Sequence, residues 1–369
     1  MPGKTDIKNF TLPELKNLLI ANDLKQYQAR QIFGWIYAKR IEDFSAMSDI
    51  SKDTRRLLEE KFYFSKLKTV KNELSKDKTE KFLFALEDKT QVESVFIPET
   101  GRNTLCVSSQ VGCKFNCKFC LSGKLGFKRN LKSSEIINQY LEVSAACAPL
   151  KITNLVFMGI GEPLDNFSNV TKAIEILTEP AGIGFSKRRI CVSTCGLVEE
   201  IKMLSRLKLG IKLSVSLHSA DDAVRSSLMP VNKKYPLKEL INAVREFSKS
   251  ETYPVTFEYA LIQGLNTGKE DAFKLIKLVR GLNCKINLIP YNEHSIFSST
   301  KCAGKILVRI TPERSEGGNE SSLKFAQPSP GDISLFCREL KNAGVFFTLR
   351  KSRGQDISAA CGQLVAAWS

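Results

Sequence analysis

Three closely spaced cysteines are the residues of this chain best suited to chemistry. They lie in the run Cys113-Lys-Phe-Asn-Cys117-Lys-Phe-Cys120, which has the pattern C-x3-C-x2-C. Three thiolates can hold three irons of a 4Fe-4S cluster and leave the fourth iron open to a substrate. A closed zinc site is the alternative, but it needs four ligands, and neither His218 nor His294 lies near the run in the sequence. The spacing therefore favours an iron–sulfur cluster with one open iron.

A second candidate for ligand binding is the turn Gly159-Ile160-Gly161-Glu162-Pro163-Leu164, which follows a predicted strand. Glycine and proline make a turn that exposes backbone carbonyls, and Glu162 adds a carboxylate, so the turn suits a positively charged ligand. Taken alone, an ordinary β-turn explains the same residues.

Three further residues have both a chemical and a plain interpretation. Cys106 lies on a predicted strand, where a lone cysteine is usually a small buried apolar residue. Cys361 follows Ser358-Ala359-Ala360 and could pack the tail, but Arg350 and other nearby cations would favour its thiolate. Glu93 interrupts an apolar strand, so it is either an outward-facing surface acid or a functional carboxylate.

The elements that must position these residues alternate between strands and helices beyond Arg102. The predicted strands are Thr104–Val107, Ile152–Phe157, Ile190–Val192, Lys212–Leu217, Val255–Tyr259, Lys285–Leu288 and Val345–Leu349. The predicted helices include Ser134–Ala146, Leu237–Phe247 and Lys269–Val279. This alternation predicts parallel β/α units that close, at least partly, into a barrel whose chemistry lies at the carboxyl ends of the strands.

Two smaller units precede this core. Residues 1–65 are predicted to be helical. The first helix is predicted to begin with a capping box, in which the side chains of Thr11 and Glu14 each accept a hydrogen bond from the other residue's backbone N–H. This unit is either a docking cap or a nucleic-acid-binding bundle. Residues 66–100 contain short extended runs and are predicted to form a small β extension. The core spans 101–350, with a loop-like insertion at 312–331, and a tail spans 351–369. The predicted fold is α/β, a partial (β/α)6 barrel with a helical N-terminal accessory domain.

Charge and composition limit the kind of partner. The chain has 369 residues, 43% of them hydrophobic and 25% charged, with a net charge of +16. These values indicate a globular protein with a polyanionic partner, and nucleic acid is the first candidate. The longest charge-free stretch that we find, Ile357 to Ser369, is too short to cross a bilayer, and the first residues lack the apolar segment of a secretory signal. We therefore expect a cytoplasmic protein without a membrane partner.

The basic residues are concentrated beside the cysteine run. Between Gly101 and Ser134 there is no Asp or Glu, and the cations are Arg102, Lys114, Lys118, Lys124, Lys128, Arg129 and Lys132. Such a run is often only a solvated face, but beside a reactive centre it suits phosphate contacts with RNA.

The cysteine run and the glycine-rich turn together resemble the radical S-adenosylmethionine (SAM) superfamily. Its signature is this three-cysteine loop with an aromatic residue, here Phe119, before the third cysteine. The resemblance implies that the open iron binds SAM and that an electron from the cluster cleaves it to a 5′-deoxyadenosyl radical. It also implies that the turn containing Gly161 and Glu162 binds the methionine end of SAM.

A narrower resemblance covers essentially the whole chain. The stretches 105–113, Ser214 to His218, Leu288 to Glu293 and 353–364 are similar to the RlmN/Cfr methyltransferases, particularly the RlmN type. That type methylates the C2 carbon of adenosine in 23S rRNA and in some tRNAs. Ile160 stands where methionine is common in the family, and residues 312–331 are longer and more polar than its usual connection.

The resemblance implies specific roles for residues of this chain. Cys361 would receive a methyl group from one SAM, and a second SAM would supply the radical that activates this methyl. Cys106 would then attack the Cys361 sulfur, release the product and form a disulfide, and Glu93 would transfer a proton. The residues that would contact SAM are Gly161, Glu162, Ser193, Ser216, Leu217, His218 and Asn292. His218 could instead be a satisfied core histidine.

The implied partners are 23S rRNA and tRNA, an electron donor such as flavodoxin and a thiol reductant, and we expect a monomer. Two alternatives remain at this point. The same scaffold could methylate adenine C8, as in the Cfr-type reaction, or the chain could be a non-catalytic iron–sulfur RNA-binding factor.

Overall fold

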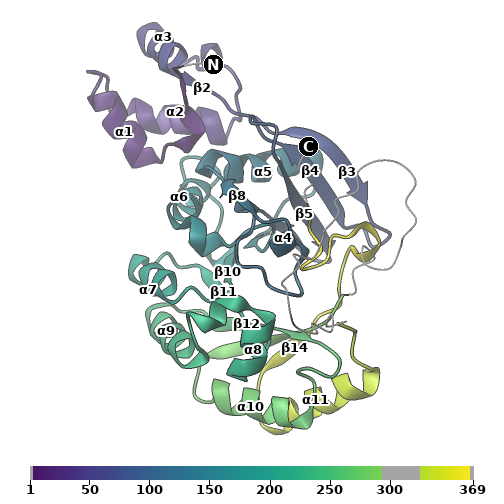
Figure 1. The fold of residues 1–369 in the computed structure, drawn as a ribbon. Helices are drawn as coiled ribbons and strands as arrows, with labels where there is room; N and C mark the ends of the chain where they lie inside the picture. The colour runs from purple at the N-terminus through teal and green to yellow at the C-terminus, as the bar shows by residue number, and fades with distance from the viewer. Residues whose placement is uncertain (1–2, 293–324, 366–369) are drawn as a thin grey trace, which may run out of the picture.

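The computed structural model describes residues 3–292 and 325–365 (Figure 1). Its main element is a sheet of ten strands in the order β14-β13-β12-β11-β10-β9-β6-β5-β4-β3. In chain order these strands are β3 (Lys68–Leu74), β4 (Glu80–Ala85), β5 (Gln91–Glu99), β6 (Arg102–Cys106), β9 (Asn154–Phe157), β10 (Ile190–Thr194), β11 (Lys212–Ser216), β12 (Val255–Leu261), β13 (Cys284–Pro290) and β14 (Phe347–Leu349). Neighbours from β6 to β14 are parallel, whereas β3 to β6 are antiparallel. The β extension and the core therefore form one continuous sheet.

Helices connect the parallel strands, as the strand–helix alternation predicts. They are α5 (Ser133–Ala146), α6 (Phe167–Thr178), α7 (Val198–Leu207), α8 (Asp222–Leu228), α9 (Leu237–Ser250), α10 (Lys269–Val279) and α11 (Pro330–Asn342). Figure 1 shows most of them along one side of the sheet. All seven predicted core strands are present, and the α/β fold with an open, barrel-like parallel sheet is confirmed.

The two faces of the parallel sheet differ because side chains alternate along each strand. On β10, Ile190 and Val192 are buried, whereas Cys191 and Ser193 are partly exposed. Helices cover one face with its apolar side chains. On the opposite face, which we call the inner face, the residues of β10 are partly exposed, whereas Cys106 and Val156 pack against the tail. A functional site on the inner face therefore does not compete with the hydrophobic core.

The N-terminal unit contains α1 (Leu12–Ile20), α2 (Gln28–Tyr37) and α3 (Lys52–Lys61), with β1 (Thr5–Asp6) paired to β2 (Phe62–Tyr63). The predicted capping box is present, because Thr11 and Glu14 exchange side-chain to backbone hydrogen bonds. The unit contacts the core through buried Lys8, whose Nζ donates to Asn138 Oδ1 on α5 at 2.8 Å. Its position is thus fixed by specific polar contacts as well as by apolar packing.

Shorter elements surround the cysteine run. The hairpin of β7 (Gln110–Gly112) and β8 (Phe127–Asn130) encloses it, together with α4 (Leu121–Lys124). The 3-10 helix Gln355–Ile357 begins the tail. Most of the predicted insertion, 312–324, lies outside the described residues. The prediction of a loop is wrong for its end, because Pro330 occupies the first turn of α11 after the N-cap Ser329. No helix of the described part is long and apolar enough to cross a membrane.

Candidate active site

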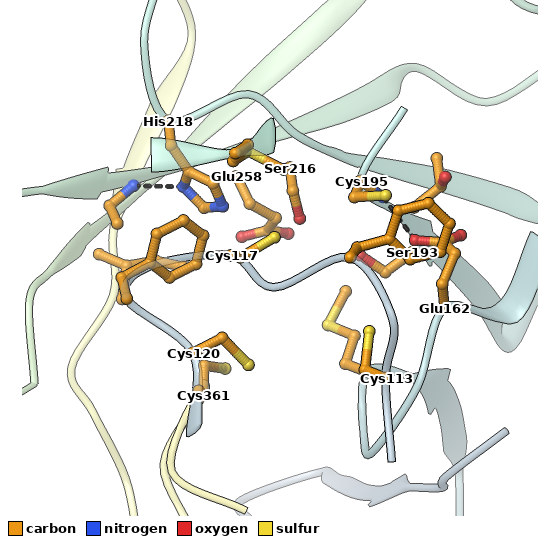
Figure 2. Close-up of a pocket in the computed structure, with 18 of the residues that line it drawn as sticks. Cys113, Cys117, Cys120, Glu162, Ser193, Cys195, Ser216, His218, Glu258 and Cys361 are labelled. Carbon is orange, nitrogen blue, oxygen red and sulfur yellow. Dashed lines mark hydrogen bonds between the residues drawn. The ribbon is translucent and has the colours of Figure 1, made fainter. Parts of the chain in front are cut away.

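A cavity opens at the carboxyl ends of the parallel strands (Figure 2). This is the position expected for the site of a parallel α/β barrel, because the loops that follow the strands converge there. Of the predicted site residues, those that line it are Cys113, Cys117, Cys120, Gly161, Glu162, Ser193, Ser216, His218, Asn292 and Cys361. The other three predicted residues, Glu93, Cys106 and Leu217, are buried next to it. Five strand ends, the cysteine loop and the tail therefore meet at one place.

The three cysteines of the run face the cavity from a single loop. Burial, and repulsion from the neighbouring thiolates, raise the pKa of Cys113 to about 12 and that of Cys117 further above its usual value. Three ionised thiols at such close quarters need a positively charged group between them, and a metal cluster provides it. The donor set of this loop thus fits an iron–sulfur cluster with three cysteine ligands.

The glycine-rich turn after β9 is held by contacts that only glycine permits. Gly161 has φ +101°, and a Cβ at this position would lie 2.5 Å from the Gln110 Cβ. Glu162 accepts the N–H of Cys195 at 2.7 Å and that of Leu164 at 3.0 Å. Burial raises the pKa of this carboxyl to about 7. Glu162 therefore joins the ends of β9 and β10 as well as facing the cavity.

His218 is both a satisfied histidine and a cavity residue. Its Nδ1 accepts the backbone N–H of Ala260 at 2.9 Å, so the neutral ring carries its proton on Nε2. Burial and the nearby Arg225 cation lower its pKa to about 3. The Phe119 ring meets it edge-on, with 4.5 Å between the ring centroids. The histidine is therefore neutral at physiological pH, and its Nε2 N–H is a hydrogen-bond donor of fixed orientation beside the cavity.

Arg225 is an organising residue that the sequence analysis missed. It is completely buried and donates to the carbonyls of Cys195, Ser216 and Leu217 at 2.8 to 3.1 Å. It also donates to Asn232 Oδ1 at 2.6 Å. One side chain on α8 therefore fixes the loops after β10 and β11 that carry the predicted SAM contacts. No spacing signal marks it, because three of its four partners are backbone carbonyls.

Glu258 is a second missed residue. It lies on β12, lines the cavity and is 5% exposed. Its Oε1 accepts from Ser214 Oγ at 2.7 Å and from Asn287 Nδ2 at 3.0 Å, whereas Oε2 has no partner among the described residues. A carboxylate inside the buried strand Val255–Leu261 is the sequence signal that could have identified it.

The tail brings Cys361 into the cavity through backbone contacts with the cysteine loop. The N–H of Leu121, next to Cys120, donates to the carbonyl of Gly362 at 2.9 Å, and Ser122 Oγ donates to the carbonyl of Leu364 at the same distance. Cys361 is exposed to the open cavity. Although the residue as a whole is exposed, burial of the thiol raises its pKa, and the Arg350 cation opposes this rise. Figure 2 shows Cys361 beside Cys120.

Cys106 and Glu93 lie behind the tail. Cys106, at the end of β6, packs in a small cluster with Ala359 and Leu364, and burial and the Cys361 thiol raise its pKa to about 12. Glu93 is 4% exposed, so it is not the surface acid that strand alternation allowed. The described cysteines are all free thiols. Cys106 and Glu93, to which the resemblance gives roles in the reaction, therefore both lie close to the tail that carries Cys361.

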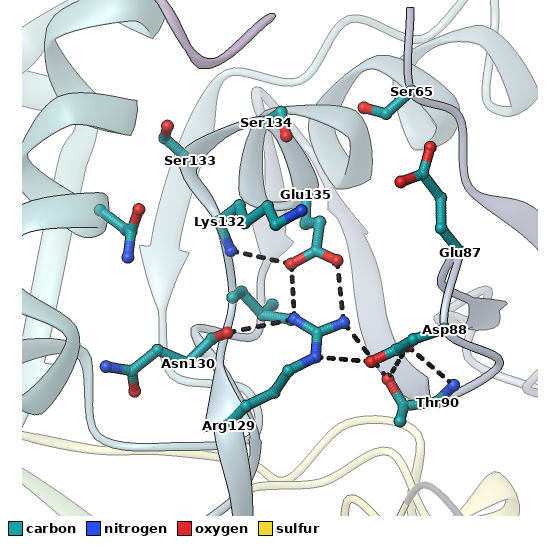
Figure 3. A network of polar contacts seen from close by, with 12 residues as sticks. Ser65, Glu87, Asp88, Thr90, Arg129, Asn130, Lys132, Ser133, Ser134 and Glu135 are labelled. Carbon is teal, nitrogen blue, oxygen red and sulfur yellow. Dashed lines mark hydrogen bonds and ion pairs between the residues drawn. The ribbon is translucent and has the colours of Figure 1, made fainter. Parts of the chain in front are cut away.

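The basic run beside the cysteines is partly neutralised within the fold. Lys114 pairs with Asp165 at 2.6 Å. Arg129 forms two hydrogen bonds with Glu135 at 2.8 and 2.9 Å and one with Asp88 at 2.7 Å (Figure 3). This network joins β8, α5 and the β4–β5 turn. Arg129 is thus a structural residue whose charge is compensated by Asp88 and Glu135. The sequence did not show this, because both acids lie outside the stretch from Gly101 to Ser134.

Comparison with known proteins agrees with this geometry. The family model described as the Radical SAM superfamily matches residues 107–276, and the Ribosomal RNA large subunit methyltransferase N-terminal domain matches residues 5–64. The fold and the site define a radical SAM protein.

Full-length relatives narrow the class. Two proteins named Dual-specificity RNA methyltransferase RlmN, from Pelobacter propionicus and Geobacter sulfurreducens, are each 43% identical to this chain. The alignments cover 99% of this chain and 96% and 93% of those proteins, respectively. The crystal structure of a radical SAM methyltransferase from Sphaerobacter thermophilus superposes with a TM-score of 0.84 at 38% identity, covering 98% of this chain and 100% of that one. The chain therefore belongs to the RlmN family of radical SAM methyltransferases.

Proposed function

We propose that the protein methylates the C2 carbon of adenosine in 23S rRNA and in tRNA. The single observation that carries this proposal is the presence of Cys361 in the cavity of the three-cysteine loop, 241 residues after Cys120 in the sequence. A cluster protein without methyl transfer would not need a tail thiol at this place. The names of the full-length relatives support the RNA substrate.

The residues of the cavity suit the two implied groups. Cys113, Cys117 and Cys120 would hold the 4Fe-4S cluster, and SAM would contact Gly161, Glu162, Ser193, Ser216, Leu217, His218 and Asn292. Leu217 would contribute backbone groups, since its side chain is fully buried. When bound, the cluster and SAM supply an electron, a carbon-centred radical and, from a second SAM in each turnover, the methyl group.

Cys361 would carry the methyl group between SAM and the base. Adenine C2 lies between two ring nitrogens and is electron-poor, so it does not attack a methyl electrophile directly. A thiolate does. Burial raises the pKa of the Cys361 thiol, and the Arg350 cation partly offsets this rise in favour of the thiolate. Its exposure to the cavity gives the sulfur access to both SAM and RNA.

Cys106 and Glu93 would complete the reaction. The radical adduct would lose the proton on C2 to Glu93 and return one electron, which the cluster could accept. The Cys106 thiolate would then attack the Cys361 sulfur and break its bond to the added carbon, and this carbon would take up a proton to become the methyl group. The attack forms a disulfide, which a thiol reductant must reopen. The shared packing of Cys106 with Ala359 and Leu364, on either side of Cys361, supports this pairing.

The rest of the chain would serve substrate binding. We assign RNA binding to the helical unit at 1–65, with a β extension at 66–100, a radical SAM core at 101–350 and the methyl-carrying tail at 351–369. The protein would act as a cytoplasmic monomer that receives electrons from a donor such as flavodoxin.

Product analysis tests the proposal. Anaerobically reconstituted protein is incubated with SAM, a reductant and unmodified 23S rRNA or tRNA, and the digested RNA is analysed by mass spectrometry against nucleoside standards. We expect 2-methyladenosine. Only 8-methyladenosine would support the Cfr-type reaction instead, and loaded protein that binds RNA without methylating it would support the non-catalytic factor.

A further inference from the structure

Three cations, Lys212, Lys285 and Arg102, lie on the inner face of the sheet that also carries Cys106. Strand register places the first of them: Cys106 pairs with Val156, Val156 with Cys191, and Cys191 with Lys212. Directly paired residues share a face, so Cys106 and Lys212 lie in one row across four strands. Three interstrand spacings of roughly 4.8 Å put their Cα atoms about 14 Å apart.

Lys285 lies in the next row of the same face. It pairs with Thr256, Thr256 pairs with Ser214, and Ser214 pairs with Ser193, which lines the cavity. Arg102 stands four residues before Cys106 on β6 and therefore shares its face, where its Nε donates to Thr104 Oγ1 at 3.1 Å. The three cations thus extend from the level of the cavity toward the other end of the inner face.

These cations do not form ion pairs with the acids near them in the part of the chain that the structure describes. Within the described residues, Arg102, Lys212 and Lys285 form no ion pair within 4.0 Å. Burial and the neighbouring Lys285 and Arg102 lower the pKa of Lys212. Two acids lie near these cations on the same face. Ser214 and Asn287 hold Oε1 of Glu258, whose Oε2 has no partner among the described residues. Glu99 is paired with Arg102 in the strand register, and its carboxylate lies 3.7 Å from Arg353. The fold therefore keeps like charges together, which costs stability unless an anionic ligand offsets the repulsion.

We propose that Arg102, Lys212 and Lys285 bind phosphates of the RNA backbone beside the adenosine that reaches Cys361 and Cys106. The inference rests on the proposed function, because it takes RNA as the substrate of this cavity. A phosphodiester backbone fits the three cations better than a single small anion, since they are spread over β6, β11 and β13. All three are at least partly exposed. The surface differs from the basic run at 114–132, which surrounds the cysteine loop.

The test compares RNA affinity in matched variants of the full chain. Lys212→Gln with Lys285→Gln forms the test pair, and Lys238→Gln, an exposed lysine on α9 outside the inner face, is the control. Binding of a fluorescein-labelled RNA hairpin with adenosine in its loop is followed by anisotropy across a salt titration. We expect the double variant to bind about tenfold or more weakly at low salt, and the slope of log affinity against log salt to fall by about 0.7 for each phosphate that the variant no longer neutralises. The control should match the wild type.

Two further readouts separate a binding defect from a folding defect. Methylation of Cys361 by SAM, measured on the intact protein by mass spectrometry, does not require RNA and should stay at the wild-type level. A Lys212→Arg, Lys285→Arg variant keeps the charges and should retain RNA affinity. Unchanged affinity and salt slope in the glutamine variant would overturn the inference. Wild-type protein that neither binds nor methylates RNA would instead overturn the proposed function.

Discussion

The carboxylate of Glu93 accepts the backbone N–H of Val365 at 2.8 Å and pairs with Lys81 at 3.3 Å. The first contact joins the β extension to the tail four residues after Cys361. The second places a cation, itself 9% exposed, against the acid proposed to accept a proton. The extension therefore both contacts the tail and supplies a cation that favours the ionised form of the acid.

Removing this cation should change the pH dependence of the reaction. Burial raises the pKa of Glu93, and Lys81 and the Val365 N–H oppose the rise. The Lys81→Met variant should therefore have a higher Glu93 pKa and a smaller ionised fraction at a given pH. Since the ionised form accepts the proton, the acid limb of the pH–rate profile should move to higher pH. Lys71→Met is the control, because Lys71 pairs with Glu73 and not with Glu93. An acid limb that stays in place would show that Glu93 does not limit the rate.

Replacing Cys361 and replacing Cys106 should block the proposed reaction at different steps. Cys361→Ala removes the methyl acceptor, so it should give no methylated RNA while the cluster still assembles. Cys106→Ala should permit methylation of Cys361 and addition to the base but block release, which traps a covalent protein–RNA adduct. Denaturing gels and mass spectrometry of protein expressed with native RNA distinguish the two results. Free methylated RNA from either variant would refute the assigned roles.

The cluster prediction concerns the cysteine loop alone. Anaerobically purified wild-type protein should contain about four irons and four sulfides per chain. Replacing Cys113, Cys117 or Cys120 by Ala should abolish iron binding and SAM cleavage. Cys147→Ala, a buried thiol at the end of α5, should leave both intact. Full activity with bound zinc and no iron would exclude the cluster.

The tail is also held by the β3–β4 turn, and this contact should affect methylation of Cys361. Asp356 accepts from Ser75 Oγ at 2.6 Å and from the N–H of Lys76 at 3.1 Å, and Asp77 accepts the N–H of Gly354 at 3.0 Å. The Asp356→Ala variant should slow the transfer of methyl from SAM to Cys361 by about tenfold, because the sulfur is less well positioned. Single-turnover mass spectrometry measures this rate. The control Asp53→Ala changes an exposed acid of α3, and an equal effect in both variants would argue against the tail contact.

The Arg129 network should contribute to stability. The Arg129 side chain is 29% exposed, so Arg129→Met should lower the free energy of unfolding by about 1–3 kcal/mol, the range for hydrogen bonds to charged groups with partial solvent screening. Its Asp88 partner has a pKa below the usual value, mainly through the hydrogen bond from Arg129. This part of the stability is therefore present at neutral pH and lost as the pH falls through the acidic range. Urea unfolding at pH 7 measures the loss, and Lys128→Met on the same strand is the comparison. An unchanged unfolding free energy would mean that the network adds no net stability.

Much of the fold could be predicted because its signals are local. Thr11 and Glu14 are three residues apart, so the capping box depends on one helical turn. The seven core strands and their connecting helices follow from hydrophobic periodicity, which reports which face of each element is buried. The three cluster ligands occupy eight consecutive positions, so their convergence on one group requires only a loop. For the same reason the cluster was the site feature that spacing alone favoured.

The other site relationships join distant parts of the chain, and only the tertiary structure decided them. The sequence left Glu93 as either a surface acid or a functional one, because alternation along a strand does not show which face the tail covers. Arg225 and Glu258 were missed, since a buried charge is recognised by its partners. Those of Glu258 lie on β11 and β13, and those of Arg225 are mainly backbone carbonyls just after β10 and at the end of β11. Arg129 acquired its partners only when α5 and the β4–β5 turn packed against β8. Long-range pairs of this kind depend on how the layers close on one another, and no local propensity encodes that closure.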